Sequence, residues 1–167
     1  MGTTLFLDVG YHDDGALAVG LLMDENEEKV YTKNIDSVQD YVPGEFYKRE
    51  LPCLLEIINQ VDLTRLKFIV IDGYVYLDRD KKHGLGMYLH HILNETVPII
   101  GVAKTPYKGS NFAEPVYRGE STNPLFITAV GVDVKVAAAF IKNLAGLYRI
   151  PDCLKKLDGL TKTKIEG

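Results

Sequence analysis

Hydrophobic and polar positions divide the start of the chain into short apolar runs joined by turns. Residues 4–9 (TLFLDV) and 16–23 (ALAVGLLM) are apolar and are separated by YHDDG, in which Asp-Asp-Gly is typical of a turn. A third run, 29–34 (KVYTKN), follows the acidic turn DENEE. We therefore predict three successive antiparallel strands at the beginning of the fold.

The next segment, 41–61, ends in a helical pattern. Its apolar residues have the three-and-four spacing of one helix face. Pro52 is expected in the first turn or at a kink, because proline lacks the amide that a helix interior requires. The apolar members of this face are Leu54, Leu55, Ile57, Ile58 and Val61.

A continuous β-branched and aromatic run, LKFIVIDG at 66–73, follows this helix. Such a run is typical of a strand buried on both faces, hence parallel and central. The remaining pattern predicts a helix at 84–94, a buried strand at 97–103, a loop at 105–124 with a short strand at 115–118, a strand at 125–130 and a long helix at 132–148.

The order of these elements predicts an α/β fold. Three antiparallel strands are followed by parallel strands in one mixed sheet, and helices flank the sheet. We expect a single domain over residues 1–160. A short amphipathic piece (DCLKKLDGL) lies near its end, and 161–167 is expected to be a frayed tail.

Composition and charge narrow the protein class without identifying it. The chain has 167 residues, of which 46% are hydrophobic and 25% charged, as in ordinary soluble domains. No apolar run approaches the roughly 20 residues of a membrane span, and the N-terminus lacks a secretory pattern, so a cytoplasmic protein without a membrane partner is expected. Cys53 and Cys153 belong to no CxxC or Cys/His cluster, which favours buried, reduced cysteines over a zinc or redox site.

The net charge of −4 argues against nonspecific coating of nucleic acid, which depends on cationic side chains. It does not exclude a nuclease, because a carboxylate cluster keeps a site acidic until a divalent ion binds there.

Three carboxylates are candidate metal ligands. Asp8 lies within an apolar strand pattern and Asp72 ends the most hydrophobic strand, where an ionised carboxylate is costly unless it is paired or binds a metal. Glu50 lies near the N-terminal end of the predicted helix, where a carboxylate is favoured electrostatically. Taken alone, Asp72 is better explained by a turn and Glu50 by a helix N-terminus, whereas Asp8 fits a structural role and a metal site about equally.

Four sequence elements resemble the endonuclease V family. They are FLDVGY, YVPGEFYKRELPCLL with its Arg-Glu pair, IVIDG and PIIGVAK, and they occur in the family's order over roughly residues 5–150. The resemblance implies a ribonuclease-H-like fold. It also implies a monomeric enzyme that cuts the second phosphodiester 3′ to hypoxanthine (inosine) in DNA or RNA, as in DNA repair.

The same resemblance assigns roles to individual residues. It makes Asp8, Glu50 and Asp72 catalytic ligands that converge on Mg²⁺, for which Mn²⁺ substitutes, and it places catalytic Lys104 at the scissile phosphate. The implied nucleic-acid-binding residues are Tyr41, Val42, Pro43 and Gly44, as a wedge beside the base, together with Gly73.

Two departures from the family pattern leave the chemistry open. Tyr74 and Val75 stand where the family has His-Gly after the catalytic Asp-Gly, and the usual site histidine falls on Val132. Asp133 either supplies a fourth metal-binding carboxylate or is a helix N-cap. The alternatives to an active deaminated-base nuclease are a catalytically weakened binding protein of this fold and a nuclease with a different substrate.

Overall fold

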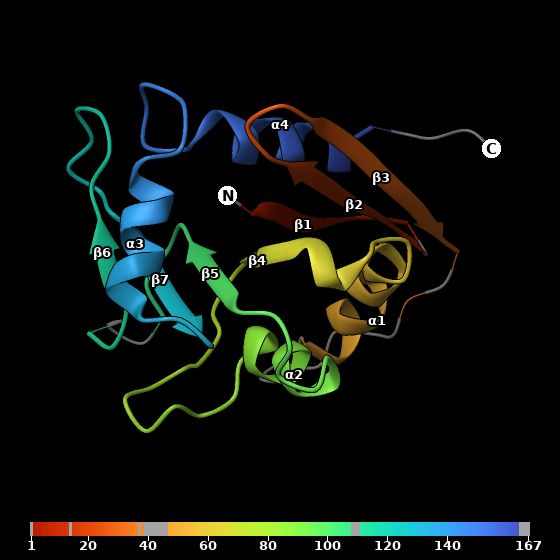
Figure 1. The fold of residues 1–167 in the computed structure, drawn as a ribbon, viewed down its shortest axis with the longest axis horizontal. Coiled ribbons are helices and arrows are strands. Elements are labelled where there is room, and N and C mark those ends of the chain that lie inside the picture. Colours follow the sequence, from red (N-terminus) through yellow and green to blue (C-terminus); the bar gives the residue numbers. More distant parts are fainter. Residues whose placement is uncertain (1, 14, 37, 39–46, 108–110, 164–167) are drawn as a thin grey trace.

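A computed structural model describes residues 2–13, 15–36, 38, 47–107 and 111–163. In this part of the chain, seven strands form one mixed sheet in the order β3-β2-β1-β4-β5-β7-β6 (Figure 1). The strands are β1 (Thr3–His12), β2 (Gly15–Met23), β3 (Glu28–Ile35), β4 (Leu66–Asp72), β5 (Ile99–Ala103), β6 (Glu114–Val116) and β7 (Leu125–Val130). The helices are α1 (Tyr47–Ile58), a short 3-10 helix (Leu63–Arg65), α2 (Leu85–Ile92), α3 (Val134–Lys142) and α4 (Asp152–Thr161).

The three antiparallel strands predicted from the apolar runs are confirmed. β1 pairs antiparallel with β2, placing Asp8 opposite Val19, and β2 pairs antiparallel with β3. The turn between β1 and β2 contains Asp13 with a positive φ of 39°, a conformation that aspartate tolerates better than most residues. Asp13 therefore lies where the turn between these strands was predicted.

The prediction of parallel strands holds for β4 and β5 but is wrong for β7. β4 is parallel to β1, and β5 is parallel to β4. β7 runs antiparallel to β5, with Val130 opposite Ile99 at the start of β5. In the described residues between β5 and β7 (104–107 and 111–124), the chain forms the edge strand β6 and loops, whereas a parallel neighbour normally requires a longer crossover such as a helix. The carboxyl ends of β4 and β5 therefore share one edge of the sheet, and β7 ends at the opposite edge.

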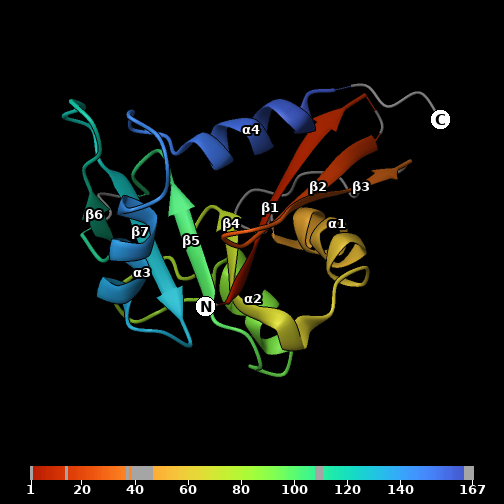
Figure 2. The same cartoon turned by 45° about the horizontal axis from the view of Figure 1, so that its top comes forward.

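Helices cover both faces of the sheet, α1 and α2 on one face and α3 and α4 on the other (Figure 2), and each pair covers an apolar core layer. Leu5 and Leu7 of β1 belong to the core under α1 and α2, whereas Phe6, between them, belongs to the core under α3 and α4. This follows from the alternation of side chains along a strand. Cys53 is buried in the first layer and Cys153 in the second, and both are free thiols, as predicted.

The helices differ from the sequence prediction mainly at their ends. α2 agrees with the helix predicted at 84–94, whereas the helix predicted at 132–148 stops at Lys142. Pro52 lies inside α1, beyond its first turn. The amphipathic piece near the end is a full helix, α4, and its last residue, Thr161, is buried. No helix in the described ranges is long and apolar enough to span a membrane.

Candidate active site

Asp8, Asp72 and Lys104 lie together at the carboxyl-end edge of β4 and β5. Asp8 is on β1, Asp72 is the last residue of the neighbouring β4, and Lys104 directly follows β5. All three line one pocket, which Leu154 and Leu157 of α4 complete. Because β1, β4 and β5 are adjacent and parallel, the sheet itself brings these three residues together.

Asp8 is the most deeply placed of these groups, with 8% of its surface exposed. Burial, followed by the negative charge of Asp72, raises the pKa of Asp8 to about 6, although the Val9 N–H donates to its Oδ1 (2.9 Å) and Lys104 opposes the rise. The residue Asp72 is exposed overall, yet partial burial of its carboxyl group also raises its pKa, with Lys104 opposing. The lysine charge thus balances part of a crowded negative site.

Glu50 extends the negative site from α1. It lies near the N-terminal end of that helix and is partly buried. Burial, then the charge of Asp72, then that of Asp8, raise the pKa of Glu50 to about 8, while Arg49 opposes the rise. The structure therefore brings all three predicted carboxylates within electrostatic reach of one another.

The carboxylates do not, however, form the closed metal-binding group that the sequence analysis expected. Within the part of the chain that the structure describes, no three His, Cys, Asp or Glu side chains lie close enough together to hold a metal ion. The Val9 N–H donates to Oδ1 of Asp8 in this arrangement.

Asp158 of α4 is a fourth carboxylate at this site, and the sequence analysis missed it. It lines a second hollow that also contains Asp8 and Asp72, and its charge raises the pKa of both. Its signal in the sequence is weak but present. In DCLKKLDGL, Asp158 directly follows the inward-facing Leu157 and stands four residues after Leu154, so it borders the apolar face of the helix.

Asp133, the predicted candidate for the fourth carboxylate, is not at the site. It is the N-cap of α3, and its Oδ1 accepts a hydrogen bond from the Lys135 N–H (2.7 Å). It follows the end of β7, which lies at the opposite edge of the sheet because β7 is antiparallel to β5. The same strand direction places Val132 away from the carboxylates.

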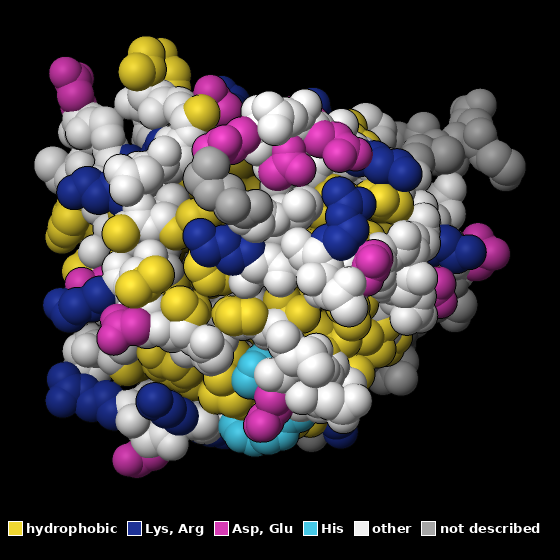
Figure 3. All heavy atoms as spheres, in the orientation of Figure 1, with side chains coloured by type: hydrophobic (Ala, Val, Ile, Leu, Met, Phe, Trp, Pro, Cys, Tyr) yellow, Lys and Arg dark blue, Asp and Glu magenta, His cyan; other side chains and the backbone are white. Residues whose placement is uncertain are grey.

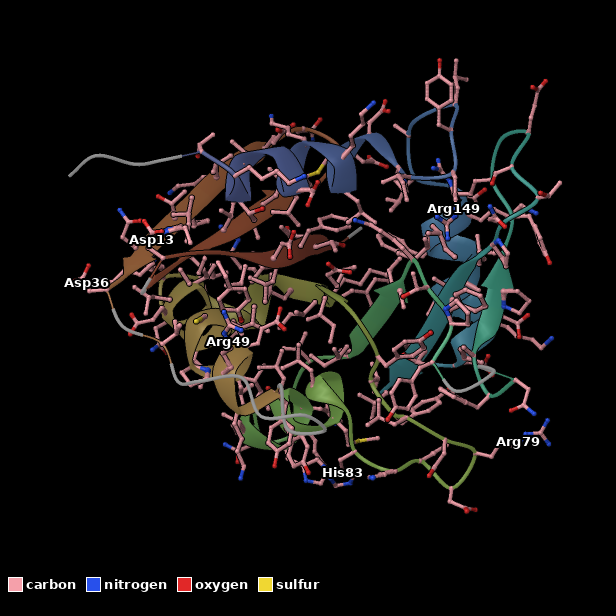
Figure 4. The ribbon with its side chains drawn as sticks, turned by 180° about the vertical axis from the view of Figure 1, so that it is seen from behind. Asp13, Asp36, Arg49, Arg79, His83 and Arg149 are labelled. Atoms are coloured by element: carbon pink, nitrogen blue, oxygen red, sulfur yellow. The ribbon has the colours of Figure 1, made fainter. Side chains whose placement is uncertain are left out.

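Arg49 and Tyr11 form a cation–π pair next to the carboxylates. The guanidinium carbon of Arg49 lies 3.7 Å from the ring centroid of Tyr11. Figure 4 shows Arg49 between α1 and β1. This contact holds the positive charge of Arg49 beside Glu50. That charge lowers the pKa of Glu50 and so opposes the rise caused by burial.

The predicted nucleic-acid-binding residues are only partly described. Gly73 has a φ of +129°, its N–H donates to the Val102 carbonyl (2.9 Å), and a Cβ added there would meet no atom within 4 Å. Glycine is therefore needed for the backbone conformation, and open space adjoins Asp72. The wedge residues Tyr41, Val42, Pro43 and Gly44 lie outside the described residues.

Comparison with known proteins links this arrangement to one family. The model of the endonuclease V family matches residues 4–145. Endonuclease V of Xanthomonas oryzae pv. oryzae is 30% identical, over 94% of this chain and 74% of that protein. Endonuclease V of Xylella fastidiosa (strain 9a5c) is 35% identical over 65% of this chain, and that match spans 45% of its own length.

Solved structures share the fold at lower identity. The Ciona intestinalis endonuclease V, crystallised with a 24mer DNA containing an inosine followed by a ribo-adenosine, matches 96% of this chain and 84% of its own, with a TM-score of 0.80 and 16% identity. The A. aeolicus Argonaute matches 99% of this chain but only 29% of its own, with a TM-score of 0.61 and 14% identity. The sheet and its helices are thus those of the ribonuclease-H-like fold.

Proposed function

The chain belongs to the endonuclease V family, and on that premise we propose that it is a divalent-metal-dependent endonuclease acting 3′ to hypoxanthine (inosine) in DNA or RNA. The observation that carries the proposal is the meeting of Asp8, Asp72 and Lys104 at one edge of the sheet. Carboxylates for a cation and a lysine for a phosphate are the groups that phosphodiester hydrolysis requires.

The donor set fits a hard divalent cation such as Mg²⁺ or Mn²⁺. Its members are carboxylates, which supply the oxygen ligands that Mg²⁺ prefers. Burial is the largest cause of the raised pKa values of Asp8 and Glu50, and the charges of neighbouring carboxylates add to the rise; a dication would offset that added repulsion. We propose that Asp8, Glu50, Asp72 and Asp158 hold the ion after drawing closer together than they lie in the described part of the structure.

A bound divalent ion would supply a hydroxide at neutral pH and offset charge on the phosphorane-like transition state. Lys104 is placed to bind a non-bridging phosphate oxygen, because it faces Asp8 and Asp72 across the pocket. Arg49, held over Tyr11, keeps a positive charge beside Glu50 and thereby favours the ionised carboxylate.

We assign recognition of the hypoxanthine base to Gly73 and to the segment Tyr41-Val42-Pro43-Gly44. The open space beside Gly73 is suited to a nucleobase next to Asp72. A hypoxanthine base pairs weakly, so turning it out of a duplex costs less than turning out a normal base. The inosine-containing DNA held by the Ciona protein supports this choice of substrate. We expect cleavage at the second phosphodiester 3′ to the base, by a monomer in the cytoplasm.

A nicking assay tests the proposal. Single- and double-stranded oligonucleotides, each with one inosine in DNA or RNA, are incubated with Mg²⁺, Mn²⁺ or EDTA. We expect metal-dependent cleavage that leaves 3′-hydroxyl and 5′-phosphate ends, and none with undamaged controls. Absence of cleavage under every metal and substrate rejects the proposal, and inosine-selective binding without cleavage assigns the chain to the binding proteins of this fold instead.

A further inference from the structure

The connection between α3 and α4 presents two apolar side chains to solvent. Leu147 is 81% exposed and Tyr148 is 70% exposed, the highest values among the large hydrophobic residues that the structure describes as exposed. Figure 3 shows hydrophobic side chains projecting at the tip of this connection. Single exposed apolar residues are ordinary, but an adjacent leucine and tyrosine with this exposure need an explanation.

The connection is held firmly by a buried arginine. Arg118 is only 6% exposed, and its guanidinium donates to the backbone carbonyls of Tyr148 and Leu144 (both 2.6 Å). It makes longer hydrogen bonds with the carbonyls of Gly146 (3.2 Å), Lys142 (3.3 Å) and Arg149 (3.3 Å). The backbone under the exposed tyrosine is therefore fixed, and little conformational entropy remains to be lost when a ligand binds to it.

The same connection is tied to the active-site edge. Arg149, the residue after Tyr148, donates through Nη2 to the carbonyls of Lys104 and Pro124. Figure 4 shows Arg149 between this connection and the ends of the sheet strands. Because Lys104 lines the pocket with Asp8 and Asp72, the side chain that follows the exposed tyrosine is hydrogen-bonded to the backbone of the proposed phosphate-binding residue.

We propose that Tyr148, with Leu147 at its side, is a stacking platform for a base of the substrate strand outside the scissile position. The inference rests on the proposed function, since the ligand is the same nucleic acid extended along this edge. An aromatic ring suits any base, because every base has a π-face, so the platform adds affinity without sequence selection. Its fixed backbone and its link to Lys104 set it apart from an exposed side chain on a free loop.

The chain has no tryptophan, which makes a direct binding experiment simple. In Tyr148→Trp the new indole is the only one, and a stacked base quenches its fluorescence. The matched control is Val136→Trp on α3, where the parent residue is 53% exposed. Both variants are titrated in EDTA at low salt with single-stranded inosine-containing and undamaged oligonucleotides.

We expect both oligonucleotides to quench Tyr148→Trp and neither to quench Val136→Trp. Equal quenching of the two variants, or none in either, overturns the proposal. A fluorescence change of Tyr148→Trp that depends on protein concentration in the absence of nucleic acid also overturns the proposal. Such a change assigns Leu147 and Tyr148 to contact with a second copy of the chain.

Kinetics separate this inference from the proposed function. In Tyr148→Ala we expect KM for an inosine oligonucleotide to rise roughly tenfold, in the range of one lost base–aromatic stack, with kcat unchanged. Tyr148→Phe keeps the ring and should retain the wild-type KM. If the wild type cuts nothing but Tyr148→Trp is quenched, the proposed function fails and the platform stands; if the wild type cuts and Tyr148→Ala leaves KM unchanged, the platform alone fails.

Discussion

Asp158 and Asp133 are aspartates on neighbouring helices, yet only the first lies beside Asp8 and Asp72 at the proposed active site. Asp158 lies on α4, lines a hollow with Asp8 and Asp72, and raises the pKa of both. Asp133 caps α3 through the Lys135 N–H. Asp133 directly follows Val132, the position at which the family histidine was expected. Proximity to that position in the sequence therefore points to the wrong aspartate.

The direction of one strand explains the difference. β7 returns antiparallel to β5, so the start of α3 lies at the edge opposite to the carboxyl ends of β4 and β5. The connection after α3 then crosses back along the molecule, and α4 packs over the active-site edge. Whether an aspartate at a helix lies at the active site therefore depends on which edge of the sheet that helix packs against.

The largest effect is expected at Asp72. Asp72→Asn removes a charge while keeping the shape of the side chain, and we expect kcat/KM for an inosine oligonucleotide to fall by about a thousandfold or more, as for residues at the centre of a catalytic site. The measurement is single-turnover cleavage in Mg²⁺.

Asp133→Asn is the matched control for that experiment, because asparagine also serves as an N-cap. It should cleave within about twofold of the wild type, as expected for a surface change away from the reacting atoms. A comparable loss in both variants would contradict the separation of the two edges.

A smaller loss is expected at Asp158. Because this carboxylate acts on Asp8 and Asp72 from α4, Asp158→Asn should lower cleavage roughly 10- to 100-fold, the range seen when a supporting group of a metal site is removed. The Mg²⁺ concentration needed for half-maximal rate should rise, and excess Mg²⁺ should restore part of the rate. A rate unchanged at low Mg²⁺ would remove Asp158 from the site.

Much of the fold could be predicted from residue patterns, because the deciding interactions are local. The alternation in β1, with Leu5 and Leu7 on one face and Phe6 on the other, reappears as two separate cores. Asp72 at the end of a buried strand is found at the edge of the sheet, next to Asp8, as expected. Whether a strand is buried and where it ends are determined largely by the residues of that short segment.

Features that depend on distant partners could not be predicted in this way. Residues 143–148 continue an apolar helical pattern, but Arg118, far away in sequence, binds the carbonyls of Lys142 and Leu144 and stabilises a turn there instead. The role of Asp158 depends likewise on where α4 packs, and no pattern inside that helix specifies the sheet edge that it covers.

Glu50 makes the active-site edge sensitive to pH. Its pKa is raised from 4.5 to about 8, so between about pH 4.5 and 8 the folded protein keeps this carboxyl protonated and folding must take up a proton. Without divalent ions, the free energy of unfolding should therefore fall as the pH rises from about 4 to 8, the sign expected for a raised carboxyl pKa. Glu50→Gln removes this contribution and should be more stable than the wild type at pH 8 by roughly 2 kcal/mol.

Urea unfolding at pH 4.5 and pH 8 in EDTA measures this difference, with Glu56→Gln on the same helix as the control. At pH 8, Mg²⁺ should stabilise the wild type more than Glu50→Gln, because the ion binds the folded state through the carboxylates. A pH profile that Glu50→Gln leaves unchanged would contradict the electrostatic account of the site.

The smallest effect is expected at the opposite edge and concerns stability alone. Asp133→Ala removes the side chain that accepts from the Lys135 N–H, and loss of such an N-cap costs about 1 kcal/mol of unfolding free energy. Asp133→Asn should restore most of that loss, and neither variant should alter the Mg²⁺ dependence of cleavage. Loss of a helix cap lowers the unfolding free energy, whereas loss of a metal ligand changes the Mg²⁺ dependence of cleavage. A change in Mg²⁺ dependence in Asp133→Ala would therefore return this residue to the active site and reverse the assignment of the two aspartates.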